Sequence, residues 1–248
     1  MIKGLYTASS SMLTAEENLN IISNNLANVS TNGYKKDQGI QRSFPELLIS
    51  RIEKGKRPAA LGSIGTGVVM EESFTDFEQG GLTRTGGQLD FALEGSGFFV
   101  IQSPEGIRYT RNGNFTLNSE GELVTAQGYH VMGERGPVQT VNTREISVTG
   151  DGQLFLGDIP GDRLLVVDFP EHNTLEKVGD NLYQNEIEGE PVEDYSVRQG
   201  FLENSNVNII REMAAMIQAN RYYESNQKVI HIMDGTLDKA VNSIASIR

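Results

Sequence analysis

Apolar residues recur at heptad spacing at both ends of the chain, and this pattern restricts the possible folds more than any other feature. At the N-terminal end, successive apolar residues are separated alternately by three and four positions: Leu5, Ala8, Met12, Ala15, Leu19, Ile22, Leu26 and Val29. This alternation is typical of a coiled-coil helix. Because glycine often follows the last turn of a helix, Asn32 and Gly33 predict where this one ends.

The C-terminal end carries a second heptad seam. Every seventh residue is apolar or aromatic: Ile209, Met216, Tyr223, Ile230, Leu237 and Ile244. Four further residues are predicted to fill the intervening turns: Met213, Met233, Val241 and Ile247. Three polar residues are predicted to interrupt the second seam position as buried groups that fix the register: Asn220, Gln227 and Asp234. Candidate N-caps at 204–206 begin a helix that we expect to span about residues 206–247.

The two predicted helices differ in length. At a rise of about 1.5 Å per residue, the C-terminal helix would be roughly 60 Å long and the N-terminal helix roughly 37 Å long. The shorter helix leaves much of the longer seam uncovered, and an exposed apolar stripe of that size marks a protein–protein surface. We therefore expect copies of the same chain to cover it. An ordinary helical hairpin within one chain is the alternative.

The positions that flank the N-terminal seam carry short, uncharged side chains. They are Ser9, Glu16, Ser23 and Ser30 on one side and Ser11, Asn18 and Asn25 on the other. Coiled coils usually place Glu and Lys at such positions. Short Ser and Asn side chains permit close approach and bind neighbouring backbone, so we expect more than one face of this helix to be covered.

Between the two ends, the period of the pattern changes to that of strands. Residues 97–111, 114–125 and 146–157 each read as a β-hairpin around a Gly-containing turn, and 164–169 and 182–186 read as further strands. The sequence therefore predicts an α+β protein. Its parts are an N-terminal helix in 1–33, an extended connector or surface hairpin in 34–80, an antiparallel β domain in 81–199 and a C-terminal helix in 200–248. The two helices would form a coiled-coil-like domain.

Charge is concentrated in the middle of the chain. The net charge is −12, and residues 81–200 account for −11 of it. An acidic middle argues against nucleic acid as a partner, because nucleic acid requires a basic face. Near-neutral ends fit surfaces that pack against many copies, although an acidic surface that only increases solubility is equally compatible. With no Cys, the chain has no disulfide and no thiol nucleophile.

Chemical motifs are absent from the sequence. The three histidines, His130, His172 and His231, do not have metal-ligand spacing, and no nucleophile elbow, HExxH motif or P-loop is present. The stretch GSIGTG at 62–67 lacks the preceding strand and the Lys-Ser/Thr ending of a phosphate loop, so it reads as a connector. We expect no enzyme activity, no catalytic, cofactor-binding or metal-binding residue, and no small-molecule substrate.

Two long stretches at opposite ends carry a family resemblance. SNNLANVSTNGYKK, residues 23–36, resembles the N-terminal signature of the flagellar basal-body rod and hook protein family. Residues 200–230 resemble the C-terminal signature of that family, and 90–133 are similar to its shared β region. Within the family, 63–68 and 178–183 are most similar to distal rod proteins, with proximal rod proteins next.

The resemblance implies an axial structural subunit of the bacterial flagellum, located in the basal body outside the cytoplasm. It implies self-assembly into a helical polymer that transmits torque, other rod and hook subunits as partners, and export by the flagellar type III apparatus without a cleaved signal peptide. The Asn- and Ser-rich flanks would contact neighbouring subunits. The expected assembly interface comprises Leu5, Met12, Leu19, Ile22, Asn25, Leu26, Asn28, Val29, Thr31, Gly33, Tyr34, Gly200, Leu202, Glu203, Ser205, Asn206, Val207, Glu212, Met213, Met216, Arg221, Tyr223 and Ile230.

Two other classes of function compete with this one. A secreted hydrolase would use carboxylates of the acidic β domain, but the sequence offers no spacing that brings such groups together. A secreted adhesin would bind a ligand with its β domain and use the helices only to form a small closed oligomer.

Overall fold

A computed structural model describes residues 2–51, 59–140, 146–192 and 195–245, and it confirms an α+β protein. The chain divides into two compact units. The helical unit comprises Met1–Leu26, Asp37–Phe74 and Asn208–Arg248, and the β unit comprises Ala27–Lys36 and Thr75–Val207. The chain therefore passes between the two units four times, at 26/27, 36/37, 74/75 and 207/208.

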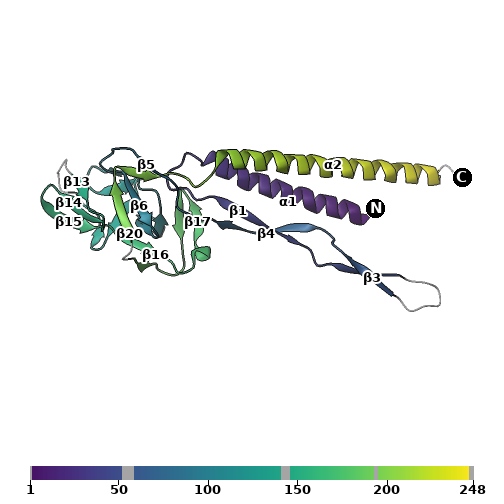
Figure 1. Cartoon of the computed structure of the whole chain (residues 1–248), viewed down its shortest axis with the longest axis horizontal. Helices are drawn as coiled ribbons and strands as arrows, with labels where there is room; N and C mark the ends of the chain where they lie inside the picture. Colours follow the sequence, from purple (N-terminus) through teal and green to yellow (C-terminus); the bar gives the residue numbers. More distant parts are fainter. Residues whose placement is uncertain (1, 52–58, 141–145, 193–194, 246–248) are drawn as a thin grey trace. The chain divides into compact units, whose positions relative to one another are not determined.

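The helical unit contains two helices and a long β-hairpin (Figure 1). Helix α1 spans Ile2–Ala27 and helix α2 spans Ile209–Ala245, and the two run antiparallel, side by side. The hairpin, here called the ribbon, is formed by β1 (Asp37–Ser43) with β4 (Val68–Thr75) and by β2 (Leu47–Arg51) with β3 (Ala59–Ile64). Part of the segment expected to be a connector or surface hairpin thus folds as a hairpin.

The seam of α1 has the predicted spacing. Ala8, Ala15 and Ile22 are buried, and the residues between them at the seam are half-buried. A helix whose apolar residues alternate at three and four positions turns them all to one side, which here is the covered side.

The seam of α2 is only partly as predicted. Met216, Tyr223, Ile230 and Leu237 are half-buried, as a first seam position requires, whereas Ile209 in the first turn of the helix is exposed, contrary to the prediction. The predictions for the side chains of Ile244 and Ile247 lie outside the described residues. The second position was predicted wrongly, because Asn220, Gln227 and Asp234 are exposed, and so are Met213 and Val241. In a heptad the second position follows the first by three residues, and the covered residues at that spacing are Ala219, Asn226, Met233 and Ala240. Met233 was predicted to be covered, whereas the small or polar side chains of Ala219, Asn226 and Ala240 concealed the rest of this position.

Helix α2 continues past the start of α1. A Cβ atom added at Gly4, near the start of α1, would collide with the side chain of Met233, so these two residues lie against each other. Residues 234–245 of α2 extend beyond that point, as the difference in helix length predicted (Figure 1).

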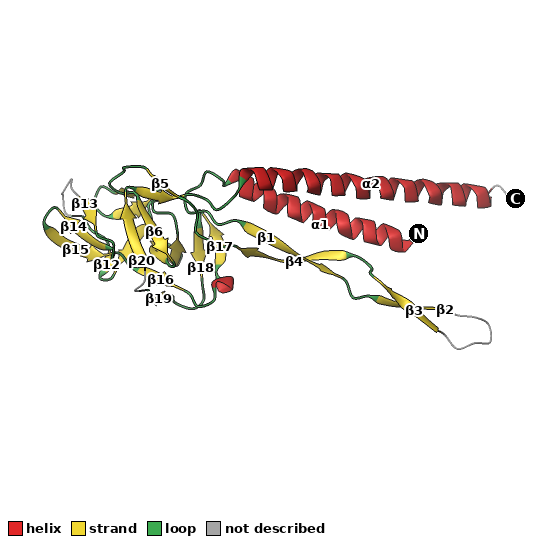
Figure 2. Ribbon diagram, in the orientation of Figure 1, coloured by secondary structure: helices red, strands yellow, loops and turns green. Residues whose placement is uncertain are grey.

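The β unit is built from antiparallel strands (Figure 2). Its largest sheet has the order β17-β18-β8-β7-β11-β10-β9, with β12 beside β11, β16 beside β7 and β19 beside β16. A three-stranded sheet β13-β14-β15 and the pairs β6–β20 and β5–β21 complete it. The bounds are β5 Leu82–Arg84, β6 Phe91–Gly95, β7 Phe98–Ser103, β8 Gly106–Thr110, β9 Phe115–Leu117, β10 Leu123–Thr125, β11 His130–Gly133, β12 Gly136–Pro137, β13 Ile146–Val148, β14 Gln153–Leu156, β15 Ile159–Arg163, β16 Val166–Asp168, the 3-10 turn His172–Thr174, β17 Glu176–Gly179, β18 Leu182–Gln184, β19 Glu190–Pro191, β20 Tyr195–Gln199 and β21 Phe201–Glu203.

The core of the β unit lies on both faces of β7. Phe99 and Ile101 pack in one buried cluster with Phe91 and Phe115, whereas Phe98 and Val100 pack in a second cluster that includes Tyr109 and Tyr183. Successive strand residues point to opposite faces, so the continuous apolar run of β7 reflects a strand covered on both sides. The three hairpins predicted around this core, β7–β8, β9–β10 and β13–β14, are confirmed.

Candidate assembly site

The structure places the expected interface residues in both units. Those in the helical unit are Leu5, Met12, Leu19, Ile22, Asn25, Leu26, Glu212, Met213, Met216, Arg221, Tyr223 and Ile230. Those in the β unit are Asn28, Val29, Thr31, Gly33, Tyr34, Gly200, Leu202, Glu203, Ser205, Asn206 and Val207. The second group brings the N-terminal and C-terminal signature stretches together inside one unit, although they are separated by more than 160 positions in the sequence.

A buried ion cluster joins the two signature stretches. The Lys35 ammonium donates to Glu203 Oε1 at 2.6 Å, and both side chains are only 1% exposed. The Arg111 guanidinium donates to the other carboxylate oxygen, with Nη1 3.5 Å from Glu203 Oε2. The backbone N–H of Gly80 donates to Oε1 at 2.9 Å. We call Lys35, Arg111 and Glu203 the ion clasp.

Burial disfavours the charged forms of Lys35 and Arg111, and the Glu203 carboxylate offsets part of that effect. Burial lowers the pKa of the Lys35 ammonium, whereas the Glu203 carboxylate beside it acts to raise that pKa. The same two influences act on the pKa of the Arg111 guanidinium, with burial again the stronger. Removing the carboxylate would leave two buried cations without their common partner, which is far more costly than losing an exposed ion pair.

Backbone contacts of the signature residues reinforce the clasp. Gly33 donates its N–H to the carbonyl oxygen of Glu203 at 2.7 Å. Its φ is +68°, and an added Cβ would lie 2.5 Å from the backbone carbon of Arg111, so only glycine fits here. Asn206 accepts from the Lys36 N–H at 2.8 Å and donates to the carbonyl oxygen of Asp76 at 2.8 Å. Gly33, Glu203 and Asn206 are therefore used within the chain itself.

Sequence reasoning matched Lys35 to the family signature but did not place it at a site, and it missed Arg111 and Gly80. Arg111 carries no local signal, because it follows an ordinary strand in an ordinary hairpin. Lys35 is the one clasp cation that stands in a signature stretch, so a lysine expected to be buried there could have raised the question of its counter-ion.

The ribbon covers a second face of α1. Thr7 Oγ1 donates to the carbonyl oxygen of Thr66 at 3.1 Å, and Thr14 Oγ1 donates to that of Val68 at 3.2 Å. Asn25 is 1% exposed, and its amide donates to the Asp37 carbonyl oxygen at 2.8 Å and accepts from the Asp37 N–H at 2.9 Å. More than one face of the helix is therefore covered, as predicted, but the flank made of Ser9, Glu16, Ser23 and Ser30 is exposed in the single chain. The polar group of Asn25 binds the ribbon of its own chain.

Replacing Asn25 by Ala is expected to loosen the ribbon from α1. The change removes two hydrogen bonds to the half-buried backbone of Asp37, each worth about 0.5–1.5 kcal/mol. Hydrogen exchange of the β1 amides measures this opening, and thermal unfolding measures the loss of stability. Asn20→Ala on the exposed side of the same helix is the control. Equal exchange in the two variants would contradict the role of Asn25.

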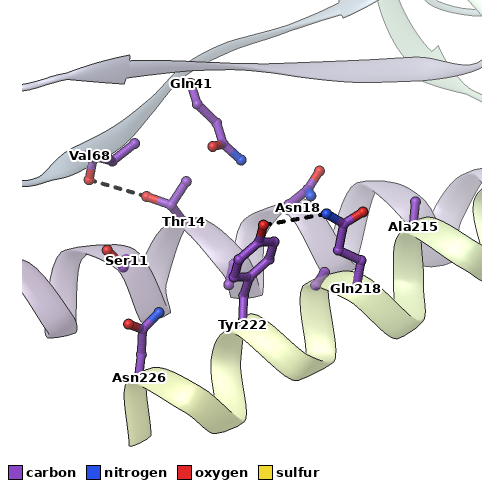
Figure 3. Close-up of a pocket in the computed structure, with 11 residues that line it drawn as sticks. Ser11, Thr14, Asn18, Gln41, Val68, Ala215, Gln218, Tyr222 and Asn226 are labelled. Carbon is purple, nitrogen blue, oxygen red and sulfur yellow. Dashed lines mark hydrogen bonds between the residues drawn. The ribbon is translucent and has the colours of Figure 1, made fainter. Parts of the chain in front are cut away.

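A cavity of about 510 Å³ lies among α1, α2 and the ribbon (Figure 3). Small or polar side chains line it: Ser11, Thr14, Ala15 and Asn18 from α1, Gln41 and Val68 from the ribbon, and Ala215, Gln218, Ala219, Tyr222 and Asn226 from α2. The cavity opens to solvent, so it is a groove on the surface of the helical unit.

Large apolar side chains are exposed on both helices. On α2, Ile210, Met213 and Ile217 are 80%, 51% and 55% exposed, and their spacing of i, i+3 and i+7 aligns them on one face. We call these three residues the α2 stripe. On α1, Tyr6 and Leu13 are exposed and separated by one heptad. Apart from Met213, sequence reasoning did not assign these residues to the interface, although each repeats at helical spacing beside the main seam.

The described residues contain no group of three or more His, Cys, Asp or Glu side chains that could hold a metal ion. Among the same residues, neither helix is sufficiently long and apolar to cross a membrane.

Comparison with known families matches three parts of the chain. Residues 5–35 match the family described as flagella basal body rod protein, and residues 198–243 match the C-terminal family of flagellar basal body rod FlgEFG proteins. Residues 92–156 match the D1 domain of the flagellar hook protein FlgE/F/G family. The first two matches contain the signature stretches joined by the ion clasp.

Individual relatives are similar over their whole length. The flagellar hook-basal body complex protein FlhO of Bacillus subtilis is 36% identical, with 100% of both chains aligned. The flagellar basal-body rod protein FlgG of Buchnera aphidicola subsp. Schizaphis graminum is 35% identical, with 96% of this chain and 98% of the relative aligned. The flagellar basal-body rod protein FlgF of Caulobacter vibrioides is 36% identical, with 98% and 97% aligned.

Proposed function

Because the chain belongs to the flagellar basal-body rod protein family and is a structural subunit of that rod, we propose that it polymerises through its terminal helices into a tube that transmits torque. The exposed apolar residues of the helical unit support this proposal most strongly. Exposed apolar groups that align along a helix are typical of protein–protein surfaces. Neighbouring copies would cover the α2 stripe and the end of α2 that extends beyond α1, and the helices would then form a coiled-coil-like inner domain.

The distribution of these residues fits head-to-tail contact between copies. The α2 stripe and the exposed pair Tyr6 and Leu13 lie on different helices. When two different surfaces meet head to tail and the rotation does not close, a helical assembly results. A two-fold dimer would instead place the same surface of both copies against each other.

Membership of the family also indicates where the protein is located and with which subunits it assembles. It locates the chain in the flagellar basal body and implies assembly with other rod and hook subunits. It indicates a structural role in place of catalysis. Relatives of both the FlgG and the FlgF kind are similar to the chain to the same degree, so the similarity fits either kind of rod subunit. We propose that the flagellar type III apparatus exports it without cleavage of a signal peptide.

Imaging of purified basal bodies that carry a labelled form of this chain tests the proposal. We expect the label in the rod, and its position along the rod distinguishes a distal from a proximal subunit. Labelled protein confined to the soluble fraction of cells that assemble normal basal bodies would contradict the assignment. Sedimentation of the purified chain over a range of concentrations gives an independent test, in which association should grow without settling at a small fixed number.

A further inference from the structure

The ion clasp draws its three members from distant parts of the chain. Lys35 and Glu203 are 168 positions apart, and Arg111 and Glu203 are 92 positions apart. All three side chains are at most 5% exposed, so the cluster exists only when the three segments have come together and excluded water.

Strand pairings bring the same two ends of the β unit together. Strand β21, which contains Glu203, pairs with β5, and β20 pairs with β6 in register from Tyr195 opposite Gly95 to Gln199 opposite Phe91. Every one of these contacts joins a segment before residue 96 to one after residue 194. The largest sheet, by contrast, contains hairpins of neighbouring strands such as β7–β8 and β9–β10. Its longer pairings, β11–β7, β16–β7 and β18–β8, join strands between Phe98 and Gln184 and involve neither end of the β unit.

The length of the loops that close and the cost of burying charges determine the order in which these contacts form during folding. Local hairpins close short loops, whereas joining Lys35 to Glu203 closes a very long one and must be compensated by contacts formed at the same moment. Burying Lys35 or Arg111 without Glu203, or Glu203 without either cation, is unfavourable, because a buried charge without its partner costs more than the pair contributes. The clasp therefore favours all-or-none closure after the hairpins have formed.

We infer that the ion clasp is a completion lock: the β unit remains open at β5, β6, β20 and β21 until both signature stretches are present, and it then closes by burying Lys35, Arg111 and Glu203 together. A subunit still passing through an export channel would lack one of the two stretches and would stay open. That last consequence rests on the proposed function, whereas the lock itself is a property of the single chain.

Folding kinetics of the full chain test the lock. In Glu203→Gln, the side chain keeps its shape but leaves two buried cations without a counter-charge. We expect unfolding to become about a hundredfold faster or more, while refolding changes by less than about threefold, because an interaction formed after the transition state affects mainly unfolding. Glu94→Gln is the matched control, since Glu94 forms an exposed ion pair with Arg198 at 2.6 Å between β6 and β20. Its rates should stay close to those of the parent.

The result that would overturn the inference is a slowing of refolding by the same factor, which would place the clasp in the transition state, or unchanged rates in both directions. Pulsed hydrogen exchange of the unaltered chain gives a second test that does not depend on a variant that folds. Amides of β7 and β8 should become protected before those of β5 and β21. Simultaneous or reversed protection would contradict the lock. Neither measurement requires polymerisation, so failure of the lock and failure of the proposed function are separate outcomes.

Discussion

Replacing Ile217 by Glu is expected to abolish rod assembly and motility while leaving the chain folded. Ile217 is 55% exposed in the α2 stripe, so the single chain tolerates the change. In the polymer, the variant loses the burial of an isoleucine, about 2 kcal/mol, and places an uncompensated carboxylate in an apolar contact. Since about 1.4 kcal/mol corresponds to a tenfold change, self-association should weaken by more than about a hundredfold.

Complementation of a strain that lacks the protein measures motility, and sedimentation measures association. Ser225→Glu is the matched control, because it adds the same charge at an exposed position of α2 outside the spacing of the stripe. Circular dichroism should show parent-like content for both variants. Polymerisation of Ile217→Glu at parental concentrations would show that the α2 stripe is not an assembly surface.

Replacing Gly80 by Ala is expected to reduce the free energy of unfolding by about 3 kcal/mol, whereas the same change at Gly81 should alter it by less than about 1 kcal/mol. A Cβ at Gly80 would overlap with the Asn204 carbonyl oxygen, while a Cβ at Gly81 meets nothing within 4 Å. The backbone at Gly80 also donates to Glu203, so a shift that relieves the collision weakens the ion clasp.

Urea denaturation of the two variants gives the comparison directly. The two glycines are adjacent and both lie outside helices and strands, so the substitution has a similar effect on the unfolded chain at either position. Equal destabilisation would mean that the loss of glycine flexibility dominates. Equal stability would mean that the chain relaxes around Asn204 without cost, and either result would contradict the close approach of these two segments.

The parts of the fold that were predicted correctly depend on residues that are close together in the sequence. The hairpin β7–β8 turns at Pro104, Glu105 and Gly106, where turn residues interrupt two apolar runs, and the heptad of α1 repeats without exception. The family resemblance was confirmed by matches at both ends of the chain.

The rest depended on partners that are distant in the sequence. The second seam position of α2 was misplaced because Ala219 and Asn226 are covered by their surroundings, not by their own hydrophobicity. The uncharged flank of α1 predicted a covered face, but nothing near Asn25 identified β1 as the partner. The ion clasp depends on three charges whose burial is visible only in the folded chain. Glu203 was expected at an interface between subunits and Lys35 was matched only to the family signature, so nothing in the sequence joined them to Arg111.

The four passages of the chain between its two units have a mechanical consequence. A load applied to one unit reaches the other through four peptide segments in parallel, at 26/27, 36/37, 74/75 and 207/208. Covalent bonds carry such a load without needing any interface to hold, and each segment bears only a share of it. In a rod made of these subunits, breaking one of the four segments would leave the other three to carry the load between the two units.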